Sequence, residues 1–151
     1  MLGLGAGGAC SGQGDNGAAL VRWRITTTSK GDVTQSLCSF SDPPSFINVA
    51  IDQVELVADR LDAVAPTPPN DFPCVASEGT TGFIIPVGTY AFSLRALACG
   101  GTLPVGFVPP PQIRDVRAGE ITNLNAIEIL IPPCTAITCA DAGNRMAACP
   151  Q

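Results

Sequence analysis

The stretch GTTGFIIPVGTYAFSLRALAC, residues 79–99, decides the fold of this chain. In its second half, apolar and polar residues alternate, except that Ala91 and Leu97 are apolar residues on the otherwise polar face. The apolar set is Tyr90, Phe92, Leu94 and Ala96, and the polar set is Thr89, Ser93 and Arg95. A period of two places alternate side chains on opposite faces of a strand, so this segment is predicted to be a strand with one buried face.

The first half of the stretch predicts a second, shorter strand and a corner. Phe83, Ile84 and Ile85 form an apolar run that is typical of a short strand. Pro86-Val87-Gly88 follows it, and proline and glycine favour a change of chain direction. Together the two halves predict a hairpin or a tight corner between strands.

Four other segments carry strand patterns, and a fifth carries a weaker one. They are residues 18–28, with Val21, Trp23 and Ile25 on the expected core face and Arg22 and Arg24 opposite; residues 46–57; residues 112–117; residues 121–131; and, less regular, residues 33–38. In 46–57 the apolar parity changes near Asp52 and Gln53, which predicts a β-bulge there. Residues 59–70, with three prolines, are expected to form a loop.

These segments predict an all-β fold, an antiparallel β-sandwich of about six to seven strands held by disulfides. At 151 residues, the chain fits one domain. We expect residues 1–17 to be a signal remnant or flexible tether, residues 18–133 to be the sandwich, and residues 134–151 to be a cysteine-containing tail.

Charge and composition exclude several classes of function. The net charge is −5 and the only lysine is Lys30, so no basic stripe is present that would favour nucleic acid. The chain contains no histidine, which removes the commonest general base and the commonest metal ligand. We therefore expect no cofactor and no nucleic-acid partner.

Seven cysteines suggest an oxidising compartment. The six that follow the first form an even set, which allows three disulfides in 15 connectivities; they are Cys38, Cys74, Cys99, Cys134, Cys139 and Cys149. A zinc site is the alternative, but no Cys-x2-Cys pair occurs. Disulfides are the favoured interpretation, and the protein is expected to be exported to the periplasm, the cell surface or the medium.

Cys10 is the odd cysteine. It follows MLGLGAGGA, which resembles the end of a bacterial lipoprotein signal peptide, where the cysteine is lipidated after cleavage. In that interpretation residues 11–17 are a polar tether. The alternative is a flexible N-terminus with a free or intermolecularly paired thiol. No later run approaches the 18 apolar residues of a membrane span, so any membrane contact is expected through this anchor.

The runs GFIIPVGTYAFSLRAL and VRAGEITNLNAIEILI resemble the closing half of transthyretin-like or carboxypeptidase-regulatory-like β-sandwich domains. The shared features are the corner at Pro86, Gly88 and Tyr90 and the Ala-Gly-Glu turn at 118–120. The resemblance covers about half of the chain and implies a sandwich fold in an exported stalk, accessory or surface module. The cysteine content and the 59–73 loop depart from that family.

Three kinds of chemistry compete with ordinary structural roles for the same residues. Paired carboxylates of a hydrolase could come from Asp52, Glu55, Glu78, Glu120 and Glu128, calcium ligands from residues 15–17 and 141–144, and a sugar-stacking ring from Trp23 or Tyr90. Solvated faces, Asx turns and core packing account for the same residues. Arg22 and Arg24 beside Arg114 and Arg117 suggest a charged face paired with glutamates.

The sequence thus predicts a non-enzymatic exported or surface module with a structural or protein-interaction role. A protein or cell-surface partner is expected, and self-association is left open. A carbohydrate- or calcium-binding extracellular module is the alternative.

Overall fold

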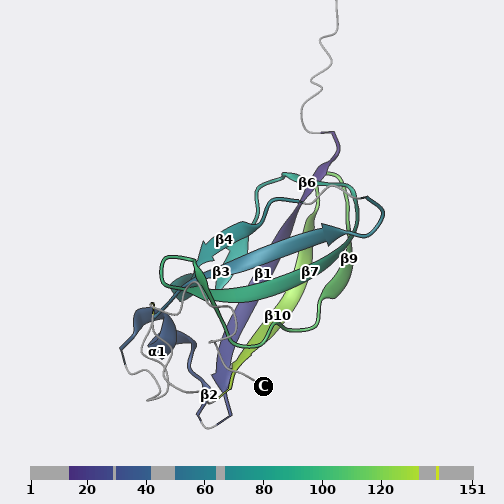
Figure 1. Ribbon diagram of the computed structural model, residues 1–151. Helices are drawn as coiled ribbons and strands as arrows, with labels where there is room; N and C mark the ends of the chain where they lie inside the picture. The colour runs from purple at the N-terminus through teal and green to yellow at the C-terminus, as the bar shows by residue number, and fades with distance from the viewer. Residues whose placement is uncertain (1–13, 29, 42–49, 64–66, 133–138, 140–151) are drawn as a thin grey trace, which may run out of the picture.

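The computed structural model describes residues 14–28, 30–41, 50–63, 67–132 and 139 (Figure 1). Within these residues the chain forms ten strands and two short helices. In chain order they are β1 (Asn16–Thr27), β2 (Gly31–Asp32), α1 (Thr34–Ser39), β3 (Ile51–Arg60), β4 (Asn70–Pro73), the 3-10 helix η1 (Cys74–Ala76), β5 (Glu78–Thr80), β6 (Ile85–Pro86), β7 (Gly88–Ala98), β8 (Leu103–Val105), β9 (Gln112–Val116) and β10 (Ile121–Ile131).

The first sheet is built around β1. β10 pairs with one edge of β1 along its length, and β6, β5 and β2 pair in turn with the other edge. The β1–β10 pairing is parallel, so the expectation of a purely antiparallel sandwich is wrong at this pair. A parallel pair needs a long connection between its strands, and here almost the whole domain supplies it.

The second sheet is built around β7, the strand predicted with most support. β3 pairs antiparallel with one edge of β7 and carries β4 on its far side. β8 and β9 share the other edge of β7. The register of β3 against β7 shifts between Ile51 and Gln53, which confirms the predicted bulge.

The core lies between these sheets, whose longest strands cross in Figure 1. Val21, Trp23 and Ile25 of β1 belong to one buried cluster that also contains Tyr90 and Phe92 of β7. The predicted core residues of β7 and β10 are buried, and Leu97 and Leu124 are buried as well at positions of the opposite parity. The all-β sandwich fold is therefore confirmed.

One predicted strand is a helix. Residues 33–38 were expected to form a short return strand, but Thr34–Ser39 form α1. Val33 and Leu37, four residues apart, are both buried, which is the spacing of one helical face. A segment this short is compatible with both the helical period and the strand period, so its packing against the sheets decides its structure.

Other boundaries also differ from the predictions. Phe83 and Ile84 form a turn, and only Ile85 enters a strand, because it alone of the three is buried. β3 begins at Ile51 and continues to Arg60, beyond the predicted limit of residue 57, while residues 46–49 lie outside the described residues. The end of the predicted 59–73 loop forms β4.

The sandwich has two distinct ends (Figure 1). We call one the N-terminal end: the start of β1, β6 and the turn at residues 117–120, where Gly119 N donates to Asn16 O at 3.0 Å. We call the other the disulfide end: α1, η1 and the turn at residues 99–102.

Candidate functional site

Two disulfides lie at the disulfide end. Cys38 of α1 is bonded to Cys74 of η1, with 5.3 Å between their Cα atoms. Cys99, directly after β7, is bonded to Cys139, with 5.5 Å between their Cα atoms. Such bonds form and persist in oxidising environments, so they point to an exported protein. Cys10, Cys134 and Cys149 lie outside the described residues.

The clustering of cysteines at one end follows from the strand order. β3 and β7 run antiparallel with Ile51 beside Ala98, and β4 pairs with β3 so that Pro73 lies beside Gln53. Cys74 and Cys99, which follow β4 and β7, therefore meet at the same end of the sandwich.

The Cys38–Cys74 bond holds two apolar side chains in solvent. Phe40 ends α1 in the left-handed region with φ of 55°, and its side chain is 40% exposed. Val75 of η1 follows the other cysteine and is 53% exposed. The bond therefore ties together the two backbone segments that carry these side chains.

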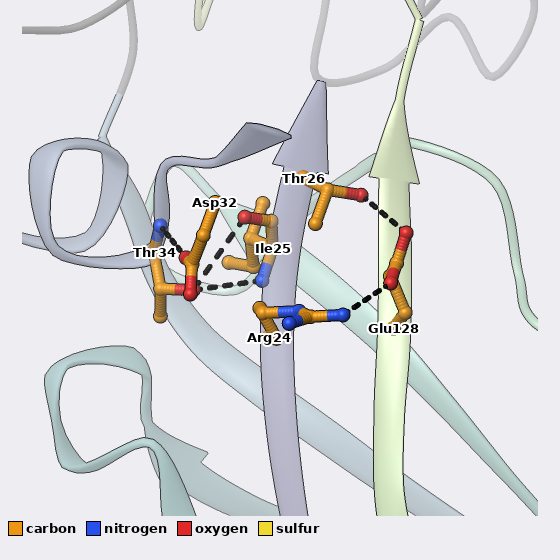
Figure 2. Close-up of polar contacts among 6 residues, drawn as sticks. All are labelled: Arg24, Ile25, Thr26, Asp32, Thr34 and Glu128. Atoms are coloured by element: carbon orange, nitrogen blue, oxygen red, sulfur yellow. Dashed lines mark hydrogen bonds and ion pairs between the residues drawn. The ribbon is translucent and has the colours of Figure 1, made fainter. Parts of the chain in front are cut away.

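A polar network ties α1 to the sheet (Figure 2). The Thr34 hydroxyl accepts a hydrogen bond from Ile25 N at 2.8 Å and donates one to Asp32 Oδ1 at 2.7 Å. Asp32 Oδ1 also accepts from Thr34 N at 3.0 Å. We call these three residues the Thr34 network. The Thr34 hydroxyl thus accepts the hydrogen bond from Ile25 N that the carbonyl of a neighbouring strand would otherwise accept at this edge of β1.

The charged residues near this network are partnered (Figure 2). Arg24 Nη2 lies 2.8 Å from Glu128 Oε2, and the Thr26 hydroxyl donates to Glu128 Oε1 at 2.9 Å. These bonds, first that of Arg24, lower the pKa of Glu128. The hydrogen bonds from the Thr34 side chain and backbone lower the pKa of Asp32. Both carboxylates are thus stabilised in the ionised form, as acceptors and not as proton donors.

The five carboxylates considered for a hydrolase are distributed over both sheets. Glu78 pairs with Arg22 at 3.1 Å on the first sheet, whereas Glu55 accepts from Arg95 Nε at 2.8 Å on the second. Asp52 Oδ2 accepts from Gly100 N at 2.8 Å. Glu128 is held by Arg24, and Glu120 lies in the turn before β10. Four of the five carboxylates therefore have individual structural partners.

The other candidate residues are placed as follows. Trp23 is 4% exposed, stacks on Phe72 with 6.0 Å between ring centroids and donates from Nε1 to Cys74 O at 3.1 Å. Tyr90 is buried and donates to Pro86 O at 2.8 Å. Both rings belong to the core, so neither can stack on a sugar.

For calcium, the segment 15–17 enters β1, where Asn16 pairs with Pro86, and residues 141–144 lie outside the described residues. Within the described part of the chain, no group of three or more His, Cys, Asp or Glu residues is placed to hold a metal ion.

The expected arginine face is only partly present. Arg22 and Arg24 lie on β1 and pair with glutamates of β5 and β10, as predicted. Arg114 lies on β9 in the other sheet, and Arg117 follows that strand. The four arginines therefore do not form one surface.

Sequence reasoning missed the Thr34 network. One signal was present: Asp32 stands two residues before Thr34, the spacing at which an aspartate side chain caps a backbone N–H. The role of the Thr34 hydroxyl toward Ile25 depends on the tertiary fold and has no local signal.

Comparison of the chain with protein-family models, curated proteins and solved structures finds no match. Among the described residues, no helix has the length and hydrophobicity needed to span a bilayer.

Proposed function

We propose that this protein is a non-enzymatic exported β-sandwich module with a structural or protein-interaction role. The observation that carries the proposal is the pair of disulfides at one end of a two-sheet core. They suit an oxidising compartment, and the Cys38–Cys74 bond ties together two segments that carry exposed apolar side chains. The resemblance to transthyretin-like domains supports the same role, since such domains commonly serve as surface or accessory modules.

The disulfide end is the proposed contact surface for a protein partner. Phe40 and Val75 are exposed on the two segments that the Cys38–Cys74 bond joins. Preorganised apolar side chains bind at a lower entropic cost than flexible ones. A partner with an apolar patch of its own would bury them.

The N-terminal segment is the proposed anchor. Cys10 follows an apolar run and precedes a polar tether, and β1 begins at the end of the sandwich opposite the disulfides. A lipid on Cys10 would place the N-terminal end toward a membrane. The disulfide end would then face away from that membrane.

The first experiment is the intact mass of the protein purified from the exported fraction of its own host, with and without reductant before alkylation. We expect at least two oxidised cysteine pairs and the added mass of a lipid on Cys10. Recovery from inside the cell with all thiols free would overturn the proposed export. Oxidised pairs without a lipid would overturn the anchor alone.

The second experiment tests the contact surface with a photo-cross-linking residue in place of Val75, introduced in the host. The matched control carries the same residue in place of Ile113 of β9, which is 58% exposed. An adduct of one defined mass at Val75, absent at Ile113, is expected. Equal adducts at both positions, or none at Val75, would contradict a contact surface at the disulfide end.

A further inference from the structure

Three large apolar side chains are exposed on one short loop at the N-terminal end. The segment 81–87, which we call the apolar loop, connects β5 to β7 and contains β6. Phe83 is 52% exposed, Ile84 58% and Val87 41%. Single exposed apolar residues are common on protein surfaces, but several on one loop mark a contact site.

The backbone of the apolar loop is fixed at both ends. Thr81 is buried, its N–H donates to Ala19 O at 2.9 Å, and its hydroxyl accepts from Ala19 N at 2.9 Å. Near the other end, the buried Tyr90 donates to Pro86 O at 2.8 Å. Ile84 N donates to Gly82 O at 2.8 Å, which closes a three-residue turn with Phe83 at its tip. The exposed side chains are therefore presented by a defined structure.

The apolar loop lies directly beside the start of β1. Pro86 pairs with Asn16, and Val87 N donates to Asp15 O at 2.9 Å. Cys10 precedes Asp15 by only a few residues, a length of chain that spans at most about 17 Å when fully extended. A flexible segment of that length has a mean span nearer ~12 Å. Whatever holds Cys10 is therefore within reach of the apolar loop.

We propose that the apolar loop contacts a lipid membrane, with Phe83, Ile84 and Val87 in the interfacial region. The proposal rests on the lipid anchor at Cys10 proposed above, because that anchor would hold the start of β1, and with it the apolar loop, close to a bilayer. Exposed apolar side chains at that position would be buried in the interfacial region.

The charges at this end predict the character of the contact. Arg60 Nε pairs with Asp62 Oδ1 at 2.6 Å, and Arg117, Asp15 and Glu120 add charges of both signs. No cationic cluster is available among these residues to attract anionic lipid headgroups. The contact is therefore apolar, and salt will change it little.

The test uses tryptophan as a depth reporter. In Phe83→Trp the new indole lies on the apolar loop, and Val75→Trp is the matched control at the disulfide end with a similar exposed fraction. Trp23 is buried and contributes a constant background. Both variants, purified from the host with their natural N-terminus, are mixed with vesicles of phosphatidylethanolamine and phosphatidylglycerol, with and without brominated acyl chains.

We expect a blue shift and bromine quenching for Phe83→Trp and neither for Val75→Trp. The double variant Phe83→Ser/Ile84→Ser should bind the vesicles roughly tenfold more weakly, in low and in high salt alike. Its two changes are at exposed positions, so the fold is retained.

The outcomes separate the inference from the anchor. If the mass shows a lipid on Cys10 and Phe83→Trp is not quenched, the anchor stands and the membrane contact of the apolar loop is wrong. If the mass shows no lipid, the vesicle titration is done with the unlipidated protein. Quenching of Phe83→Trp without quenching of Val75→Trp would then support the membrane contact, and no quenching of Phe83→Trp would overturn it. Equal quenching of Val75→Trp would also overturn it, because the contact would not be confined to this end.

Discussion

Replacement of Thr34 by valine should destabilise the domain by about 2 kcal/mol. Thr34 is buried, and its hydroxyl is the acceptor for Ile25 N at 2.8 Å. Valine preserves the shape but leaves that buried N–H without this acceptor, which costs ~1–3 kcal/mol. Asp32 also loses a donor, but it is exposed and water replaces most of that interaction.

Thr34→Ser is the matched control, because serine keeps the hydroxyl and removes only a methyl group, at a cost of about 1 kcal/mol. Urea unfolding at neutral pH, followed by the fluorescence of the single tryptophan, measures both variants. The order of stability should be wild type, then serine, then valine. A valine variant as stable as the serine variant would refute the role of the hydroxyl.

The pH dependence gives a second readout for the same pair. The Thr34 side chain lowers the pKa of Asp32 below its ordinary value of 3.8. The resulting stabilisation is present above that value and is lost as the pH falls through the lower pKa of the folded state. The destabilisation by valine should therefore shrink in acid, whereas that by serine should not. If valine destabilises the domain as much in acid as at neutral pH, the Thr34 hydroxyl does not lower the pKa of Asp32.

Two further predictions concern the ends of the sandwich. The pair of changes Cys38→Ala and Cys74→Ala removes a bridge across 36 residues and should lower the free energy of unfolding by about 4 kcal/mol in urea; a loss below ~1 kcal/mol would contradict this. Tyr90→Phe removes the hydrogen bond to Pro86 and should cost about 1 kcal/mol at neutral pH. Burial raises the pKa of Tyr90 above its ordinary 10.0, so the wild type loses stability as the pH rises beyond that value. The difference in free energy of unfolding between the wild type and Tyr90→Phe, measured in urea, should therefore narrow above that pH. A difference that stays constant would contradict this.

Segments with a regular alternation could be predicted from the sequence. Tyr90 to Ala96 of β7 and Ile127 to Ile131 of β10 have the expected inward residues, because apolar residues recur there at every second position. The buried Leu124 of β10 has the opposite parity, since the register against β1 shifts beside it. The bulge in β3 was visible as a change of apolar parity. Short elements carried no such pattern, since a helix of six residues or a strand of two is determined by what packs on it.

Pairing partners could not be predicted in the same way. The alternation in β1 and β10 predicts which side chains face inward. It does not predict that the two strands are neighbours in the sheet, or whether they run parallel or antiparallel. The disulfide connectivity is a consequence of the same unknown, because Cys38 meets Cys74 only once α1 has docked against η1. The candidate contact residues Phe40 and Val75 depend on that docking too, so no sequence pattern marks them.

The parallel β1–β10 pair indicates what the disulfides contribute. Arg24 and Glu128 pair across 104 residues, while the bridges bypass 36 and 40 residues. Together the two bridges shorten the covalent path from Arg24 to Glu128 roughly by half. Halving a loop lowers the entropic cost of closing it by only ~0.6 kcal/mol. Ile25 beside Ile129 is fully buried, and each such side chain contributes about 1.5–3 kcal/mol. Packing therefore holds β1 and β10 together, and the covalent bonds chiefly secure the segments that they join directly, which include α1, η1 and the start of the 99–102 turn. That is the stabilisation that a contact surface at the disulfide end would require.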